Sequence, residues 1–470
     1  MSVIYSTEAA DLLTPVSAYI RLTALAEGSY RFLFESVEGG AARGRYSVIA
    51  LLPDLVWKCR NGQVFVDGVP REEAPLDTLN AIIRDSQMDL PVGLPPMIGG
   101  VFGVLGYDMV RQMEFLPNPP VNDLDLPEGI MIRPQLFAVF DSVRDELTLA
   151  IPLRNGMTDE KAQALLQKAR DVLSAPLPPS HETLPAGTEL SPPASNMSQR
   201  QFEDNIRNAQ AYIAAGDAFQ IVPSQRFTTP FPLSPLALYR SLRRINPAPF
   251  LFLMELEDYA LVGSSPEILV RLRDGEITVR PLAGTRPRGK DREHDLALEK
   301  ELLADQKELA EHLMLIDLGR NDVGRVSQLG SVQVPERFVI ERYSHVMHIS
   351  STVTGRIRPE KTAMDALVAA FPAGTLTGAP KIRAMEIIDE LEPTRRGPYS
   401  GCVGYFGADG EMDTCIGLRM AVLKDGQMYV QAGCGVVADS NPTAEFEETR
   451  AKARALFRAA EVAVSNAAKA

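Results

Sequence analysis

Cysteine and histidine, the side chains that most often hold zinc or carry nucleophilic chemistry, are scarce in this chain. Four cysteines and five histidines are spread over 470 residues, and no two cysteines form a CxxC pair. The sequence therefore predicts reduced, packed thiols and excludes the usual zinc-binding and disulfide frameworks.

Positive charge and long apolar runs are also in short supply. The formal net charge is −13, which argues against a nucleic-acid surface because such surfaces need clustered lysine and arginine. No apolar run reaches the ~18 residues of a membrane span, and the first residues lack the basic and apolar segments of a signal peptide. We expect a cytoplasmic globular protein with no membrane or nucleic-acid partner. An anionic substrate stays possible, because a metal and a few cations can reverse the field inside a cleft.

A stretch rich in proline and serine divides the chain. It reads SAPLPPSHETLPAGTELSPP and has no apolar periodicity, which is typical of a linker. We place the N-terminal region at 1–173, the linker at 174–197 and the catalytic region at 198–470.

Turn signals and apolar alternation predict a fold of the α+β class. Asp-Gly pairs separate short alternating runs, as they do in β-hairpins, and no strand–helix–strand rhythm is present. Strands are expected over 219–228, 250–256, 259–272, 276–282, 398–407, 411–424 and 427–438. Helices are expected over 158–173, 296–317, 380–391 and 442–464, and after a capping box formed by Ser198 and Gln201.

Carboxylates on two predicted helices are candidate metal ligands. Glu445 and Glu448 are three residues apart and share a helix face, and Glu311 lies where another helix turns apolar. Such a set can hold a hard cation such as Mg²⁺. The same spacing equally describes a solvated face with an ordinary pair between Glu448 and Lys452.

Glycine-rich turns and one histidine motif are further candidates. PLAGTRPRGK is similar to a phosphate loop, but Pro287 interrupts it and Asp291 replaces the required serine or threonine, so we reject a nucleotide site. FPAGTLTGAPK and AGCGVVADS precede helices whose backbone N–H groups could bind a carboxylate. In ERYSHVMHISS, His345 and His348 have no third metal ligand nearby, which favours one acid–base histidine over zinc.

Five blocks of the chain together resemble the chorismate-utilising enzymes. The blocks are RPLAGTRPRG, AEHLMLIDLGRNDVGRV, ERYSHVMHISS, FPAGTLTGAPKIRAMEIIDELEPTRRGPYSG and AGCGVVADSNPTAEFEETRAKARAL. The family includes anthranilate, aminodeoxychorismate, isochorismate and salicylate synthases. The resemblance implies a two-lobed body of large antiparallel sheets packed together, with helices outside and the active site in the cleft between the lobes.

The resemblance also implies roles for individual residues. Mg²⁺ would be held by Glu311, Glu445 and Glu448 and would bind the ring carboxylate of chorismate. Glu267 would be the general acid for the departing hydroxyl, His348 would transfer a proton during loss of pyruvate, and Thr375 would line the site. Contacts with the substrate would come from Gly284, Thr285, Tyr399, Arg419, Gly433, Cys434, Gly435 and Lys452. Cys434 stands where relatives often have alanine.

Two positions separate the members of the family. Aminodeoxychorismate synthases commonly carry a nucleophilic lysine where this chain has Ala283, and an alanine cannot form that covalent intermediate. Isochorismate and salicylate synthases carry a water-activating lysine at the position that matches Gln220. The remaining chemistry is addition of ammonia at C2 and elimination of pyruvate, which gives anthranilate. Because some aminodeoxychorismate synthases lack the lysine, that activity is the alternative, and a non-catalytic binding subunit is a more distant one.

The resemblance further implies a regulator and a partner. The motif LFES resembles the tryptophan-inhibition site of anthranilate synthases, with Ser36 as the main polar contact and Pro249, Phe250 and Leu251 opposite it. An ordinary strand end is the alternative for LFES. Ammonia would come from a glutamine amidotransferase on a separate chain, in a hetero-oligomer.

Overall fold

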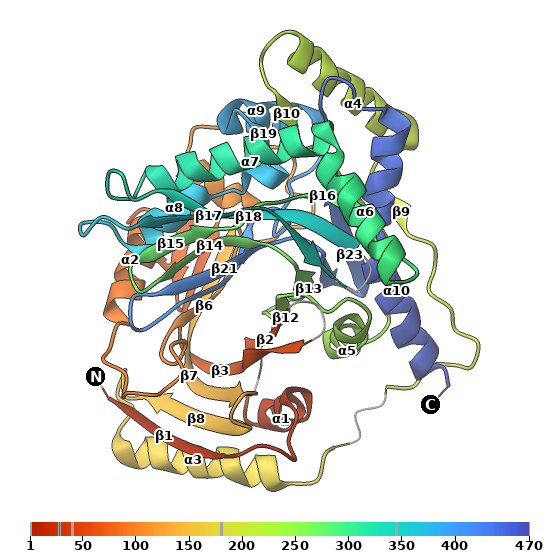
Figure 1. The fold of residues 1–470 in the computed structure, drawn as a ribbon. Coiled ribbons are helices and arrows are strands. Elements are labelled where there is room, and N and C mark those ends of the chain that lie inside the picture. The colour runs from red at the N-terminus through yellow and green to blue at the C-terminus, as the bar shows by residue number, and fades with distance from the viewer. Residues whose placement is uncertain are drawn as a thin grey trace.

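The chain folds into one large sheet system covered by helices (Figure 1). The structure is a computed structural model that describes residues 2–26, 28, 30–38, 42–178, 182–343 and 346–469. Its helices are α1 Pro15–Leu22, α2 Pro75–Asp85, α3 Asp159–Ser174, α4 Gln199–Ala214, α5 Pro235–Ile245, α6 Arg292–Ala304, α7 Gln306–Gly324, α8 Ala363–Ala370, α9 Lys381–Leu391 and α10 Pro442–Ala467. Short 3₁₀ turns are η1 Thr23–Leu25, η2 Tyr107–Gln112 and η3 Gly374–Leu376.

Strands from the whole length of the chain share this sheet. They are β1 Val3–Ala9, β2 Arg31–Glu38, β3 Ala42–Arg60, β4 Gln63–Val66, β5 Val69–Arg71, β6 Val101–Leu105, β7 Gly129–Asp141, β8 Glu146–Pro152, β9 Ala194–Ser195, β11 Ser224–Pro230, β12 Phe250–Glu255, β13 Tyr259–Ser265, β14 Ile268–Arg273, β15 Glu276–Val279, β16 Leu282–Pro287, β17 Gln333–Arg342, β18 Val346–Arg356, β20 Cys402–Phe406, β21 Met412–Ile416, β22 Met420–Lys424 and β23 Gln427–Gly433. A separate small pair joins β10 Gln220–Ile221 to β19 Gly378–Ala379.

Antiparallel pairing confirms the predicted α+β class. β2 pairs antiparallel with both β3 and β12, and β6 pairs antiparallel with β20. Strands from both sides of the proline-rich segment therefore pair with each other. The predicted domain boundaries at 173 and 198 stay predictions. The hydrogen-bonded sheet contains strands from both sides of them.

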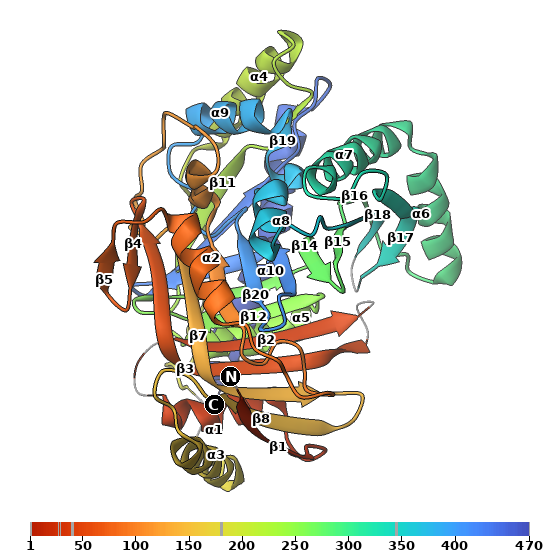
Figure 2. The ribbon, with the colours of Figure 1, turned by 90° about the vertical axis from the view of Figure 1, so that its left-hand side faces the viewer.

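The apolar side chains form layers between the sheet and the helices. One cluster lies between strand faces and includes Phe32, Phe102, Phe137 and Phe252. A second cluster joins α1, α3, α5 and α10 to the sheet, and a third joins α2, α7 and α8 to it. In both views α1 and α3 lie at one end of the molecule and α4 and α9 at the other (Figures 1 and 2). The predicted packing of sheets with helices outside is confirmed.

One predicted helix is wrong in an informative way. The expected helix over 296–317 is two helices, α6 and α7, that meet at Asp305. The Asp305 carboxylate accepts hydrogen bonds from the backbone N–H groups of Lys307 and Glu308, at 3.1 and 3.3 Å. Asp305 thus caps the start of α7, and a capping aspartate competes with continuation of a helix. The predicted helix starts at Ser198 and Asn441 are confirmed by their caps.

All four cysteines are buried with free thiols, as predicted. Among the described residues, no helix is long and apolar enough to cross a membrane.

Candidate active site

Two strands that the sequence predicts as continuous are interrupted and a third ends early, and each of these places carries predicted site residues. The segment 259–272 breaks between β13 and β14, where Pro266 lacks the N–H needed for pairing and Glu267 follows it. The segment 411–424 breaks before Arg419, whose φ of 50° lies in the left-handed region. The strand expected over 427–438 ends at Gly433. In the folded chain, Glu267, Arg419 and Gly433 therefore lie at strand ends and not in the middle of paired strands.

Glu267 is a buried carboxyl that is set up to hold a proton. It is 7% exposed, and its Oε1 accepts hydrogen bonds from Thr375 Oγ1 at 3.1 Å and from the Leu282 backbone N–H at 3.4 Å. Burial raises the pKa of Glu267 to about 8, against the lowering effect of these hydrogen bonds and of Arg419. A carboxyl with this pKa is protonated at neutral pH, so it can act as a general acid.

His348 is oriented by a fixed acceptor. Its Nδ1 lies 3.0 Å from the Gly284 carbonyl oxygen and 3.1 Å from Thr285 Oγ1. Because a carbonyl only accepts, Nδ1 must carry the hydrogen, which leaves the lone pair on Nε2. Burial lowers the pKa of His348 to about 4, so the ring is neutral at pH 7 and Nε2 can accept a proton. His345 lies outside the described residues.

Gly284 needs to be glycine at this position. Its φ is +62°, a region that side chains rarely adopt, and an added Cβ would come within 3.1 Å of the Glu308 carboxylate. The left-handed turn directs the Gly284 carbonyl to His348 and places Thr285 beside the ring.

Arg419 supplies positive charge in the middle of the predicted site. Its guanidinium interacts electrostatically with Tyr399, Glu448 and Glu267, which come from three separate segments of the chain. Burial lowers the pKa of Arg419, although these anionic groups oppose the shift. No hydrogen bond or ion pair joins its side chain to another described residue. A cation in this position fits recognition of a carboxylate.

The turn after β23 brings backbone and a second cation to the same place. Lys452 Nζ donates to the Gly433 carbonyl oxygen at 2.9 Å and pairs with Glu448 at 2.6 Å. A Cβ on Gly433 would lie 3.0 Å from the Tyr399 hydroxyl, and one on Gly435 would lie 2.7 Å from Gln220 Nε2. Small residues are therefore required along this turn, and the fully buried Cys434 fits between the two glycines.

The three predicted metal ligands lie on two helices, and the charges of the two on α10 influence the one on α7. Burial raises the pKa of Glu311 on α7 to about 7, and the nearby charges of Glu445 and Glu448 on α10 raise it further. Burial likewise raises the pKa of Glu445, and Glu448 adds to the shift. Partly buried carboxylates that repel one another are a donor set that suits a hard divalent cation, because the cation offsets their charge. In the part of the chain that the structure describes, no three acidic, histidine or cysteine side chains are already grouped at metal-binding distance. The Mg²⁺ site stays a prediction.

Only some of the cavities in the structure are lined by predicted site residues. A hollow of about 380 Å³ is lined by Glu311, Lys307 and Phe219, and a small cavity of about 40 Å³ adjoins Glu267 and Thr375. A larger hollow of about 680 Å³ between α1, α5 and α10 contains none of the predicted site residues. The two smaller spaces are the relevant ones because Glu267 lines one and Glu311 the other, and the pKa of both carboxyls is raised.

The predicted tryptophan site is brought together in part. Leu251 pairs with Glu35 across β12 and β2, which puts Phe250 beside Ser36 on the opposite face of the sheet. Ser36 Oγ donates to the Tyr46 carbonyl oxygen at 3.3 Å. Leu251 is 2% exposed and packs in the cluster with α1 and α5, away from Ser36, and Pro249 lies just before β12.

Sequence reasoning missed the buried ion pair of Glu392 and Arg396. Their side chains are 3% and 2% exposed, although both residues lie in the charged run ELEPTRRG. The signal in the sequence was that the pair lies within the family block FPAGTLTGAPKIRAMEIIDELEPTRRGPYSG, close to Tyr399.

The chain is similar to known proteins over nearly its full length. A model of the family described as chorismate binding enzyme matches residues 16–458. Anthranilate synthase component 1 from Cereibacter sphaeroides is 50% identical over 98% of this chain and 94% of its own length. The component 1 from Pseudomonas aeruginosa is 47% identical, over 97% of this chain and 94% of its own length.

Solved structures agree in fold. Anthranilate synthase component I from Streptococcus pneumoniae has a TM-score of 0.83 and 37% identity, covering 96% of this chain and 99% of its own. The menaquinone-specific isochorismate synthase from Escherichia coli has a TM-score of 0.74 at 19% identity, over 98% of this chain and 94% of its own, which is a likeness of fold alone.

Proposed function

Because the chain belongs to the family of chorismate binding enzymes, we propose that it is the chorismate-converting component of an anthranilate synthase. It would convert chorismate and ammonia into anthranilate and pyruvate, in tryptophan biosynthesis in the cytoplasm. The observation that carries this proposal is the convergence of a protonated acid, Glu267, with two cations, Arg419 and Lys452, at strand ends and a glycine turn.

The first step would use Glu267 as the acid. Ammonia forms a bond to C2 of the ring, both ring double bonds shift, and the C4–O bond breaks; the ammonium group formed at C2 then gives up a proton. The departing hydroxyl takes the Glu267 proton and leaves as water, which avoids release of hydroxide. Thr375 and the Leu282 N–H then stabilise the carboxylate that remains, because both donate to its Oε1.

The second step would use His348 as the base. Its neutral ring presents Nε2 while Nδ1 is held by Gly284. Removal of the proton from C2 supplies the electron pair that makes the ring aromatic, and the C3–O bond to the enolpyruvyl group breaks. The released enolate takes up a proton and becomes pyruvate.

Substrate charge would be balanced from two sides. Chorismate is a dianion, so Arg419, Lys452 and the Gly433–Gly435 backbone would take one carboxylate. Glu311, Glu445 and Glu448 would hold Mg²⁺, which when bound would offset the other carboxylate. Burial and neighbouring acidic charges raise the pKa of Glu311 and of Glu445, which supports a cation at this place.

Product choice would depend on the residue beside the Gly435 turn. Gln220 is 7% exposed and lies against Gly435, and glutamine cannot deprotonate a water molecule. Ala283 lies in β16 next to Gly284 and offers no nucleophile. Both residues support ammonia, rather than water or an enzyme lysine, as the group that adds to the ring.

The proposal includes a separate glutamine amidotransferase chain as the ammonia source. Co-expression with such a partner should give glutamine-dependent synthesis and a complex on size-exclusion chromatography. The isolated chain should use ammonium salts only.

Regulation by tryptophan is the finer part of the proposal, and Ser36→Ala tests it. Loss of one hydrogen bond should raise the tryptophan inhibition constant about 3- to 10-fold. The rate without tryptophan should not change, because Ser36 lies on β2 and contacts none of the proposed catalytic residues. The measurement is ammonia-dependent anthranilate fluorescence against tryptophan concentration. An unchanged inhibition constant would remove Ser36 from the regulatory site.

The same fluorescence assay tests the reaction itself. Purified chain with chorismate, Mg²⁺ and excess ammonium should produce anthranilate. Consumption of chorismate without anthranilate fluorescence, with the 4-amino product detected by chromatography, would contradict the proposal in favour of aminodeoxychorismate synthesis.

A further inference from the structure

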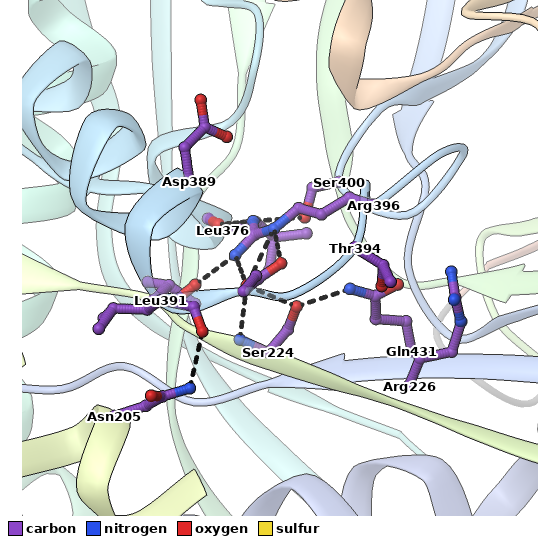
Figure 3. A network of polar contacts seen from close by, with 12 residues as sticks. Asn205, Ser224, Arg226, Leu376, Asp389, Leu391, Thr394, Arg396, Ser400 and Gln431 are labelled. Atoms are coloured by element: carbon purple, nitrogen blue, oxygen red, sulfur yellow. Dashed lines mark hydrogen bonds and ion pairs between the residues drawn. The ribbon is translucent and has the colours of Figure 1, made fainter. Parts of the chain in front are cut away.

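Arg396 forms an ion pair with Glu392 and lies in a buried network of polar contacts (Figure 3). The Arg396 side chain is 2% exposed and the Glu392 side chain 3%. Burying a charge pair has a desolvation cost that its geometry must offset, so the pair by itself is weak evidence for added stability.

Every N–H of the Arg396 guanidinium has an acceptor. Nε donates to Glu392 at 3.0 Å, and Nη2 donates to Glu392 and to the Val222 carbonyl, both at 2.6 Å. Nη1 donates to the Leu376 carbonyl at 2.7 Å and to Ser400 Oγ at 3.1 Å. This accounts for all five donors of an arginine side chain, and no other residue type offers five in a planar fork.

The acceptors belong to segments that each carry a predicted active-site group. Leu376 directly follows Thr375, whose hydroxyl donates to Glu267. Val222 precedes Pro223, whose carbonyl oxygen accepts from the Cys434 N–H at 3.1 Å. Thus one side chain connects the acid to the glycine turn.

Tyr399 and Ser224 complete the connection. The Arg396 guanidinium carbon lies 5.6 Å from the centroid of the Tyr399 ring, within cation–π range. Glu392 Oε1 accepts from the Ser224 backbone N–H at 2.7 Å and from Ser224 Oγ at 2.8 Å. Ser224 pairs with Gly433 across β11 and β23.

We propose that Arg396, held by Glu392, is a positioning residue for the reaction, setting where Thr375, Tyr399 and the Gly433–Gly435 turn lie relative to one another. The inference rests on the proposed function for its activity readout. Displacement of a catalytic group by ~1 Å can cost about 100-fold in rate, so Arg396 can affect the rate without contacting the substrate.

Arg396→Lys is the first test. A single ammonium cannot reach Glu392, Val222 and Leu376 together, so η3 should shift and the Thr375 hydroxyl should leave Glu267. We expect kcat to fall about 10- to 100-fold, with a smaller change in KM. Because the hydrogen bond from Thr375 lowers the pKa of Glu267, its loss should move the falling limb of the pH–rate profile to higher pH. Arg419 and Glu341, which also interact with Glu267, are unchanged in this variant.

Arg395→Lys is the matched control. Arg395 is the neighbouring residue and forms a comparable ion pair, 2.9 Å from Glu128, but it contacts none of the active-site segments. The Arg395→Lys variant should have a lower melting temperature, with kcat and the falling limb of the pH–rate profile unchanged. If loss of charge balance prevents folding at position 396, the double variant Glu392→Gln/Arg396→Met removes both charges and should fold with the same kinetic defect.

The outcomes separate the two hypotheses. No anthranilate from the wild type would contradict the proposed function only. Wild-type kcat and an unmoved pH limb in Arg396→Lys and in the double variant would overturn the positioning role. Independently of activity, a crystal structure of Arg396→Lys in which Thr375 still donates to Glu267 would also overturn it.

Discussion

Replacing Glu267 with glutamine should lower kcat about 100- to 10,000-fold, the range expected for loss of a general acid. Glutamine keeps the shape of the side chain and still accepts from Thr375 and Leu282, so binding of chorismate should be nearly unchanged. What it loses is the proton for the departing hydroxyl. Single-turnover rates of anthranilate formation, with chorismate affinity measured separately, make the test.

Glu341→Gln is the matched control for that variant. Glu341 lies on β17 and pairs with Arg280 at 2.7 Å, yet its charge raises the pKa of Glu267. Its loss should reduce the rate far less, and should move the falling limb of the pH profile to lower pH. Equal defects in both variants would show that Glu267 acts through charge alone and is not the acid.

The elevated pKa of Glu267 also predicts an effect on stability. Burial raises it to about 8, well above the ordinary value of a glutamate, so the folded state binds this proton more tightly than the unfolded chain does. The stabilisation by proton binding is complete below the unfolded pKa and is lost as pH rises through about 8. Thermal melts should therefore show that the stability of Glu267→Gln relative to the wild type increases as pH rises from 5 to 9. The increase should fall in the interval of ~4 pH units between the unfolded and the folded pKa of Glu267.

Glu448→Gln and Glu311→Gln should each abolish the dependence of the rate on Mg²⁺ and lower it by at least about 100-fold, because a bound cation contributes several kcal/mol of charge stabilisation. The two residues come from different helices, yet their charges interact. The double variant should be little worse than either single variant, because groups that act as one unit are not additive. Initial rates over a Mg²⁺ titration provide the measurement.

Glu447→Ala is the control on the same helix. Glu447 directly precedes Glu448 but pairs with Arg450 at 3.0 Å, and its side chain is 52% exposed. It should keep both the rate and the Mg²⁺ dependence of the wild type. A Mg²⁺ response that survives in Glu311→Gln and Glu448→Gln would remove these carboxylates from the metal site.

The sequence by itself determined much of the secondary structure. Asp-Gly turns, apolar alternation and the caps at Ser198 and Asn441 are local signals, and the structure follows them. The helix break at Asp305 was missed because a capping aspartate in the middle of a charged helix looks like any other acidic residue. The resemblance to the family, rather than any local pattern, marked Glu267, Arg419 and Gly433 as site candidates.

Tertiary structure alone decided what those candidates can do. A carboxyl becomes an acid at neutral pH only when burial raises its pKa, and the groups that bury Glu267 come from distant parts of the chain, including Thr375. The strand breaks at Pro266 and before Arg419 likewise depend on long-range packing, as does the burial of Arg396 within a charged run. Local sequence patterns encode backbone preference, whereas desolvation and charge coupling depend on distances between segments that only the folded chain brings together.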